Sequence, residues 1–130
     1  MIIIGLYAGL LGILYIVLSY RISSLRRKHK VGLGDGGIND LQQAIRAHAN
    51  YMEYVPLCLI LLVVLAANGA DIMIIHISAS ILVFARVLHF VGLTQRSGTS
   101  FGRLWGTVLT WLLILFLSGL NIYQFLNLSF

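Results

Sequence analysis

Three side chains able to do chemistry, Arg46, Asn50 and Glu53, lie close together in a largely apolar chain. Steps of four and seven residues return to the same face of an α-helix, so the three side chains form one stripe. The uncharged apolar run from Tyr54 to Ala67 follows directly. Charged side chains at the edge of hydrocarbon are costly unless they pair or face a polar cavity. We therefore treat this stripe as a candidate functional site.

Composition places the stripe in an integral membrane protein. Of the 130 residues, 59% are hydrophobic and 10% are charged, whereas about a quarter of the residues in a soluble domain are charged. The chain has room for one small domain, residues 1–130. Its formal net charge of +5 does not indicate nucleic-acid binding, because no soluble surface is large enough to grip a duplex. We expect contact with the lipid bilayer and none with nucleic acid.

Four apolar segments predict an all-α fold, a bundle of four transmembrane helices. The expected spans are about 2–20, 40–67, 71–93 and 103–127. A basic segment follows the first span where a signal peptide would have a small-residue cleavage site, so we expect that span to remain in the protein. Asn68-Gly69-Ala70 predicts a tight turn between the second and third spans.

The charges of the loops predict the orientation of the chain in the membrane. The first span is followed by five basic residues, Arg21, Arg26, Arg27, Lys28 and Lys30. Arg96 and Arg103 flank the loop between the third and fourth spans, while the turn at Gly69 carries only Asp71. The positive-inside rule then places both basic loops in the cytoplasm and both termini in the periplasm.

The tight turn also predicts which residues share a depth in the membrane. In an antiparallel hairpin centred between Gly69 and Ala70, Glu53 is level with Arg86, and Asn50 is level with His89. Each pair lies on the cytoplasmic side of the bilayer, and Arg86 and His89 share a helix face because they are three residues apart. A simpler alternative is a structural ion pair between Glu53 and Arg86 that holds the two helices together.

The other titratable side chains suggest no further chemistry. Cys58 lies inside an apolar run and is expected to serve packing or to face lipid. We expect His48 to be solvated at the interface and His76 to be a satisfied core or interfacial histidine, while His29 belongs to the basic loop. Metal-ligand spacing is missing from the Cys, His, Asp and Glu residues, so we predict no metal site.

Three motifs resemble the MAPEG family, the membrane-associated proteins in eicosanoid and glutathione metabolism. Arg46-Ala-His-Ala-Asn50-Tyr-Met-Glu53-Tyr-Val-Pro56 resembles the signature of the family's second helix. Arg86-Val-Leu-His89 resembles the next motif, and Gly102-Arg103-Leu-Trp-Gly106, with Thr107 and Thr110, resembles the start of the fourth helix. The resemblance covers nearly the whole chain, and the Gly34-Asp35-Gly36-Gly37 loop looks like the short bacterial branch.

The resemblance implies a homotrimer of four-helix protomers in the bacterial inner membrane, with glutathione bound between neighbouring subunits on the cytoplasmic side. The positions that match glutathione-binding residues are Arg26, Arg46, Asn50, Glu53, Arg86 and His89. Arg103 matches the arginine that stabilises the glutathione thiolate, and would be the catalytic residue. The simpler alternative for Arg103 is an anchor of the fourth helix at the lipid headgroups.

The chain departs from the family pattern at three positions. An arginine-x-arginine pattern reads Ser24-Leu25-Arg26, so its first arginine is absent. Leu93 stands where eicosanoid-processing members tend to have tyrosine, and Ala49 replaces a basic residue found in some members. These departures argue against eicosanoid chemistry.

Glutathione chemistry accounts for the residue types of the stripe and its neighbours. Arginine forks suit the two carboxylates of the tripeptide, Glu53 suits its ammonium, and Asn50 could bridge as donor and acceptor. A fixed cation at Arg103 would lower the pKa of the thiol from its free value near 8.5. We therefore expect a glutathione-dependent transferase or peroxidase that acts on lipophilic electrophiles.

Two other functions remain as alternatives at this point. The first is a non-enzymatic membrane scaffold that keeps the MAPEG-like fold. The second is a small multidrug-type transporter, which would want an acidic residue in the first span, where the sequence has none.

Overall fold

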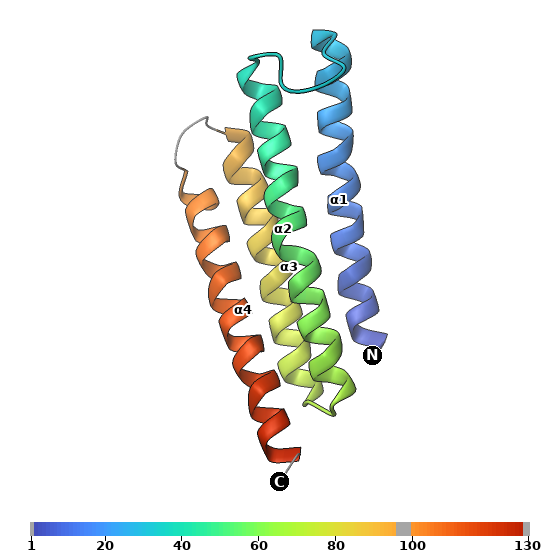
Figure 1. Cartoon of the computed structure of the whole chain (residues 1–130), viewed down its shortest axis with the longest axis vertical. Helices are drawn as coiled ribbons and strands as arrows, with labels where there is room; N and C mark the ends of the chain where they lie inside the picture. The colour runs from blue at the N-terminus through green and yellow to red at the C-terminus, as the bar shows by residue number, and fades with distance from the viewer. Residues whose placement is uncertain (1, 96–99, 129–130) are drawn as a thin grey trace.

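The structure, a computed structural model, describes residues 2–95 and 100–128. These residues form four helices, which are α1 (Ile2–His29), α2 (Asn39–Ala67), α3 (Ile72–Gln95) and α4 (Phe101–Leu128). Each helix is long and apolar enough to cross a membrane, and the four lie side by side as a bundle (Figure 1). The prediction of an all-α fold with four membrane-spanning helices is confirmed.

Helix α1 extends nine residues beyond the span expected at 2–20, through the basic segment. Arginine, lysine and leucine are good helix formers, and four basic residues in the last turn complement the negative end of the helix dipole. The helix ends where Lys30 adopts a left-handed conformation with φ +55°. The Val31 amide then donates to the Arg26 carbonyl at 3.0 Å, which closes the last turn.

Helices α2 and α3 form the centre of the bundle. Each contacts the other three helices, while α1 and α4 lie on opposite sides of this pair, with no contact between them in the described ranges. The core is apolar, and its fully buried members include Leu11, Cys58, Leu62, Leu82 and Leu117. Cys58 is a free thiol in this core, as its position in an apolar run predicted. Many large apolar side chains face outwards, as expected for a surface in contact with lipid.

The connection between α2 and α3 is the tight turn that the sequence predicted. Gly69 has φ +81°, a conformation that favours glycine. The amides of Asn68 and Gly69 donate to the carbonyls of Val64 and Ala66, both at 3.1 Å. Because the turn is short, α2 and α3 run antiparallel in direct contact, which fixes the depth of one helix against the other.

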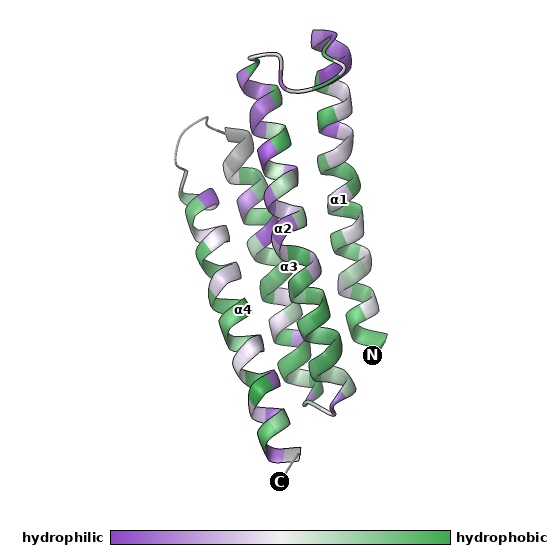
Figure 2. Cartoon of the chain, viewed as in Figure 1, coloured by the Kyte–Doolittle hydropathy of each residue, from purple (hydrophilic) through white to green (hydrophobic). Residues whose placement is uncertain are grey.

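Polar residues are concentrated at one end of the bundle, around the loop that joins α1 to α2 (Figure 2). We call this end, which carries residues 21–40, the basic end. Helix α2 is about 44 Å long at ~1.5 Å per residue, longer than the ~30 Å hydrocarbon core. Its first turns can therefore project into the headgroup region. Arg96, one of the residues used to predict orientation, lies outside the described residues.

Candidate functional site

A polar cavity of about 290 Å³ opens between α2, α3 and α4. It is lined by Arg46, Asn50, Glu53, Tyr54, His89, Arg103, Thr107 and Trp111. Five of the seven site residues predicted from the sequence thus lie around one cavity, and three separate helices supply them. The remaining two predicted residues, Arg26 and Arg86, do not line it.

Helix α2 supplies one wall of the cavity through the stripe of Arg46, Asn50 and Glu53. The opposite face of the same helix carries Ala47, Tyr51 and Val55, all buried in the core. Burial of this apolar face turns the polar stripe outwards. At ~1.5 Å per residue, Arg46 lies about 10 Å and Glu53 about 21 Å along the axis from Asn39. The cavity therefore extends over about 11 Å along the first half of α2, beginning near the basic end.

Arg86 lies behind the cavity and is 2% exposed. Its guanidinium donates to Asn50 Oδ1 at 3.0 Å, to the Gly106 carbonyl at 2.8 Å and to the Thr110 hydroxyl. Its Nε atom is buried without a hydrogen-bond partner. Because Arg86 occupies the oxygen of Asn50, the amide NH2 of Asn50 is left to face the cavity as a donor. Arg86 therefore positions a cavity residue and does not itself line the cavity.

The ion pair expected between Glu53 and Arg86 is not formed, so that alternative is wrong. The His29–Asp40 contact is the one ion pair in the part of the chain that the structure describes. Equal depth does not fix the direction of a side chain: Glu53 is exposed on the cavity side of α2, whereas Arg86 points between α2 and α4. The Glu53 carboxylate is consequently free of any protein cation among the described residues, although it lies well below the end of the helix.

The start of α4 is attached to α3 in a way that places Arg103. The Ser100 hydroxyl donates to the Gly92 carbonyl of α3 at 2.8 Å, and its oxygen accepts the Arg103 amide at 3.3 Å. Ser100 thus caps α4 while bonded to the neighbouring helix. Arg103 lies in the first turn after this cap and is exposed at the rim of the cavity.

Glycines allow α3 and α4 to approach closely beside the cavity. A Cβ atom at Gly106 would lie 2.7 Å from both the Ala85 carbonyl oxygen and the His89 Cβ atom. A Cβ atom at Gly102 would lie 2.7 Å from the Leu88 carbonyl oxygen. Small residues that let two backbones meet are typical of helix pairs in membranes. This contact brings His89 and Arg103 to the same cavity.

We predict that Gly106→Ala destabilises the protein by about 1–3 kcal/mol, because its Cβ must displace backbone and not a flexible side chain. Unfolding in mixed micelles would measure the change. Gly119→Ala is the matched control on the same helix, since a Cβ there meets nothing within 4 Å. Equal effects of the two substitutions would show that the close approach of α3 and α4 is not what stabilises this region.

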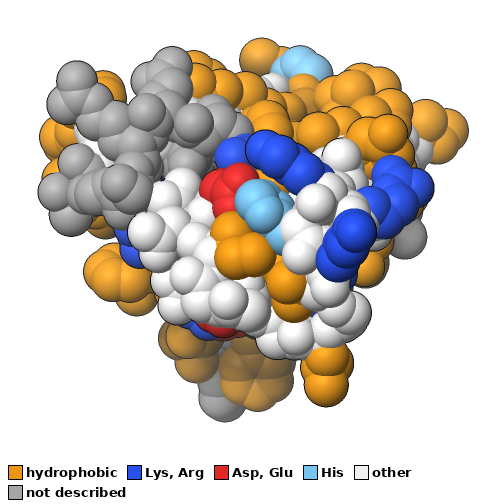
Figure 3. Space-filling view, turned by 90° about the horizontal axis from the view of Figure 1, so that it is seen from above, with side chains coloured by type: hydrophobic (Ala, Val, Ile, Leu, Met, Phe, Trp, Pro, Cys, Tyr) orange, Lys and Arg blue, Asp and Glu red, His pale blue; other side chains and the backbone are white. Residues whose placement is uncertain are grey.

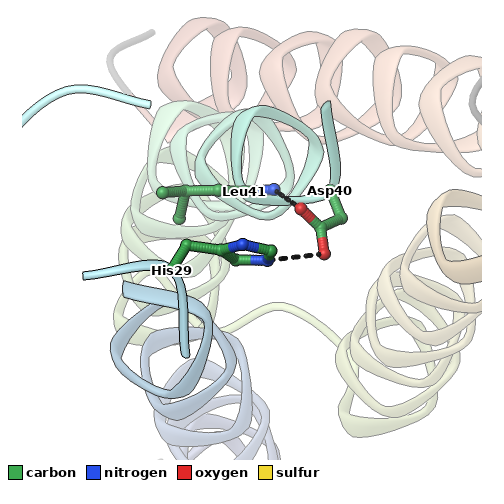
Figure 4. A network of polar contacts seen from close by, with 3 residues as sticks. All are labelled: His29, Asp40 and Leu41. Carbon is green, nitrogen blue, oxygen red and sulfur yellow. Dashed lines mark hydrogen bonds and ion pairs between the residues drawn. The ribbon is translucent and has the colours of Figure 1, made fainter. Parts of the chain in front are cut away.

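Arg26 is placed away from the cavity, in the connection between α1 and α2. Its Nη1 atom donates to the Gly34 carbonyl at 2.8 Å and to the Val31 carbonyl at 3.4 Å. This guanidinium holds the loop in position. Close by, His29 Nε2 lies 3.3 Å from Asp40 Oδ2, and Asp40 Oδ1 accepts the Leu41 amide at 2.9 Å (Figure 4).

The other two histidines bond to side chains of α1. His48 Nε2 lies 3.1 Å from Ser19 Oγ, and its ring contacts Tyr15. It joins α1 to α2 and is partly exposed, so its solvation stays a prediction. Tyr15 and Ser19 face it because they are four residues apart on α1. His76 Nδ1 lies 2.7 Å from the Tyr7 hydroxyl.

Within the described residues, no group of three or more Cys, His, Asp or Glu side chains could hold a metal.

Sequence reasoning assigned no role to four residues of the site: Tyr54, Thr107, Thr110 and Trp111. Thr107 and Trp111 lie four and eight residues after Arg103, so the three side chains share one stripe of α4, and this spacing could have revealed them. Thr110 faces the other way and accepts a hydrogen bond from Arg86. The Tyr54 ring lies beneath the Arg86 guanidinium, with 5.8 Å between Cζ and the ring centroid.

The cavity is electropositive and adjoins an apolar groove. Arg46 and Arg103 at its rim and Arg86 behind it supply three cations against the single carboxylate of Glu53. A groove of about 390 Å³ along the start of α4 is lined by Ser100, Phe101, Arg103, Leu104 and Thr107. Arg103 and Thr107 line both spaces. The cavity is thus complementary in charge to a small zwitterion with excess negative charge, and the groove beside it is apolar.

The comparisons with known proteins show one family and two relatives named as inner membrane proteins. The sequence model of the MAPEG family matches residues 4–123 of the chain. Inner membrane protein YecN of Escherichia coli (strain K12) is 37% identical over 92 residues, which are 71% of this chain and 70% of that protein. The protein of the same name from Escherichia coli O6:H1 matches to the same extent.

Proposed function

The chain belongs to the MAPEG family, and from this premise we propose that it binds glutathione in the polar cavity and activates the thiol for attack on lipophilic electrophiles. The observation that carries the proposal is the Glu53 carboxylate, which has no protein partner in the described residues and faces a cavity with arginines at its rim. A carboxylate at this depth needs a cationic group from a ligand or a neighbouring subunit.

The charges of glutathione complement those of the cavity. In the proposed complex its two carboxylates would bind Arg46 and the amide NH2 of Asn50, and its ammonium would bind Glu53. The buried cation of Arg86 would add attraction for the net negative ligand, since low dielectric strengthens the interaction. Asn50 would offer its NH2 group to the ligand as a donor, while its oxygen accepts a hydrogen bond from Arg86.

Arg103 is the residue that we assign to chemistry. It lies where the polar cavity meets the apolar groove, so a glutathione sulfur beside it would face an electrophile arriving from the bilayer. The guanidinium remains charged at neutral pH and would stabilise the thiolate. Conjugation and peroxide reduction begin with the same thiolate, so the site supports either a transferase or a peroxidase.

The proposed assembly is a homotrimer in the inner membrane with both termini in the periplasm. The inner membrane is the location in the name of the Escherichia coli relative. The basic loops would then face the cytoplasm, where glutathione would enter the cavity. A neighbouring subunit would close the exposed side of the cavity, and its Arg26, in the last turn of α1, would contribute to glutathione binding.

Glutathione should raise the melting temperature of the purified protein in neutral detergent. A ligand that binds only the folded state adds about 2.7 kcal/mol at 100 times its Kd. A tripeptide with alanine in place of cysteine should bind within a few-fold, because the two carboxylates and the ammonium are unchanged. A melting temperature that neither peptide shifts would contradict the proposal and favour a scaffold without glutathione chemistry.

Glu53→Gln should weaken glutathione binding by about 10- to 100-fold, since a hydrogen bond to a charged group contributes about 1.5–3 kcal/mol. The matched control is Asp71→Asn, which removes an exposed carboxylate in the turn between α2 and α3, far from the cavity. Titration of the melting temperature with glutathione would measure both. If both variants bound glutathione like the wild type, Glu53 would not be the ammonium ligand.

A further inference from the structure

The basic side chains at the end of α1 form two groups with different surroundings. Arg26 and His29 are engaged in the connection between α1 and α2, through the Gly34 carbonyl and Asp40 respectively. Arg27, Lys28 and Lys30 are exposed, and none forms an ion pair within the described residues. These three cations are therefore not needed to hold the loop.

The two acidic residues nearby, Asp35 and Asp40, form no ion pair with the exposed cations among the residues that the structure describes. Asp35 Oδ1 accepts the Gly37 amide at 2.9 Å, so this carboxylate is turned onto its own loop. Asp40 is occupied by His29 and by the Leu41 amide (Figure 4). Seen from the basic end, Lys and Arg side chains lie exposed around an acidic and a histidine side chain (Figure 3). With five Arg and Lys side chains against two Asp side chains, residues 21–40 carry a net positive charge.

Apolar side chains accompany the exposed cations. The Tyr20 ring is 65% exposed and lies beneath the Arg27 guanidinium, with 5.8 Å between Cζ and the ring centroid. Leu33 is 92% exposed in the loop just after Lys30. Exposed tyrosines are enriched where hydrocarbon meets the headgroups, and long cationic side chains extend from there to the phosphates. Both apolar residues therefore indicate a surface that lies in the interface and not in open water.

We propose that Arg27, Lys28 and Lys30, flanked by Tyr20 and Leu33, bind the phosphate groups of acidic phospholipids in the adjoining leaflet. A cluster of cations directly beyond a membrane span attracts anionic headgroups, and one cation near the surface strengthens association by about fivefold. Tyr20 and Leu33 favour a lipid over a soluble anion as the occupant, because only a lipid also covers their apolar surface. This inference is independent of glutathione binding.

The experiment uses the full chain reconstituted in phosphatidylcholine vesicles that contain a trace of spin-labelled phosphatidylglycerol or spin-labelled phosphatidylcholine. Electron spin resonance gives the relative association constant of the two labels with the protein. We expect a preference of at least about fivefold for phosphatidylglycerol, which Arg27→Gln/Lys28→Gln/Lys30→Gln removes. Salt should weaken the preference of the wild type, because exposed charges are screened.

Two control proteins separate this surface from general effects of charge and folding. Arg27→Lys/Lys28→Arg/Lys30→Arg keeps every charge and should keep the preference. Arg26→Gln removes a charge one residue away and should keep it too, since that guanidinium is bound to loop carbonyls. No preference in the wild type, an equal preference in the neutral triple variant, or a loss with Arg26→Gln would each overturn the proposal. The proposal would also be overturned if inorganic phosphate displaced the spin-labelled phosphatidylglycerol more strongly than sodium chloride does at equal ionic strength.

Discussion

Replacing Arg103 by leucine should lower turnover with a model electrophile by about 10²–10³-fold, the usual effect of removing one donor to a developing charge. Glutathione should still bind within a few-fold of the wild type, because Arg46, Asn50 and Glu53 would hold the body of the tripeptide. The lost interaction matters most where the sulfur carries charge, so kcat/KM should fall by more than the affinity does.

Arg103→Lys is the control for this substitution, because it keeps a cation without the planar fork. It should retain part of the turnover that Arg103→Leu loses. The competing role of Arg103 is an anchor for α4 at the headgroups, as loop-flanking arginines commonly are. In that case Arg103→Leu would destabilise the protein, and turnover per folded molecule would be unchanged.

Replacing Arg86 by leucine should weaken glutathione binding by about 10- to 100-fold, although Arg86 does not line the cavity. The substitution removes the donor to Asn50 Oδ1, so the amide is free to rotate and loses its fixed donor geometry. It also removes the buried cation behind the site. Leaving a buried acceptor without a donor should in addition lower the unfolding free energy by about 1–3 kcal/mol.

A double-mutant cycle identifies the partner through which Arg86 acts. Arg86→Leu and Asn50→Ala should be strongly non-additive for glutathione affinity, with a coupling of about 0.5–3 kcal/mol, because the two side chains share one hydrogen bond. Arg86→Leu and Glu53→Gln should be close to additive. If Arg86→Leu were instead coupled only to Glu53→Gln, the two residues would form the ion pair expected from their equal depth. That result would contradict the conclusion that Arg86 positions Asn50.

Most of the fold could be predicted from composition and loop charge. Four apolar segments of spanning length leave few alternatives to a helical bundle in a membrane, and Gly69 marks the hairpin between α2 and α3. The end of α1 could not be predicted from hydropathy, since the helix continues into the basic segment where the apolar pattern stops. Helix propensity and the helix dipole, which do not depend on apolarity, decide that boundary.

The sequence predicted most of the residues that line the candidate site, but not the hydrogen bonds between them. Helical spacing placed Arg46, Asn50 and Glu53 on one stripe, and all three line the cavity. The hairpin symmetry correctly put Arg86 near the second helix, but its partner is Asn50, one helical turn from Glu53. The direction of the Arg86 side chain depends on a third helix, α4, because its guanidinium donates a hydrogen bond to the Gly106 carbonyl of that helix. No pattern within α2 and α3 contains that information.

The most direct measurement of the central proposal is the ultraviolet absorbance of the glutathione thiolate bound to the purified full chain at neutral pH. Because a free thiol with a pKa near 8.5 is mostly protonated there, a bound thiolate gives a new band. We predict a band that grows to saturation with glutathione and is lost in Arg103→Leu at equal occupancy. A wild-type protein that is saturated with glutathione, as judged by its melting temperature, but has no thiolate band would contradict the assignment of this cavity to thiol activation.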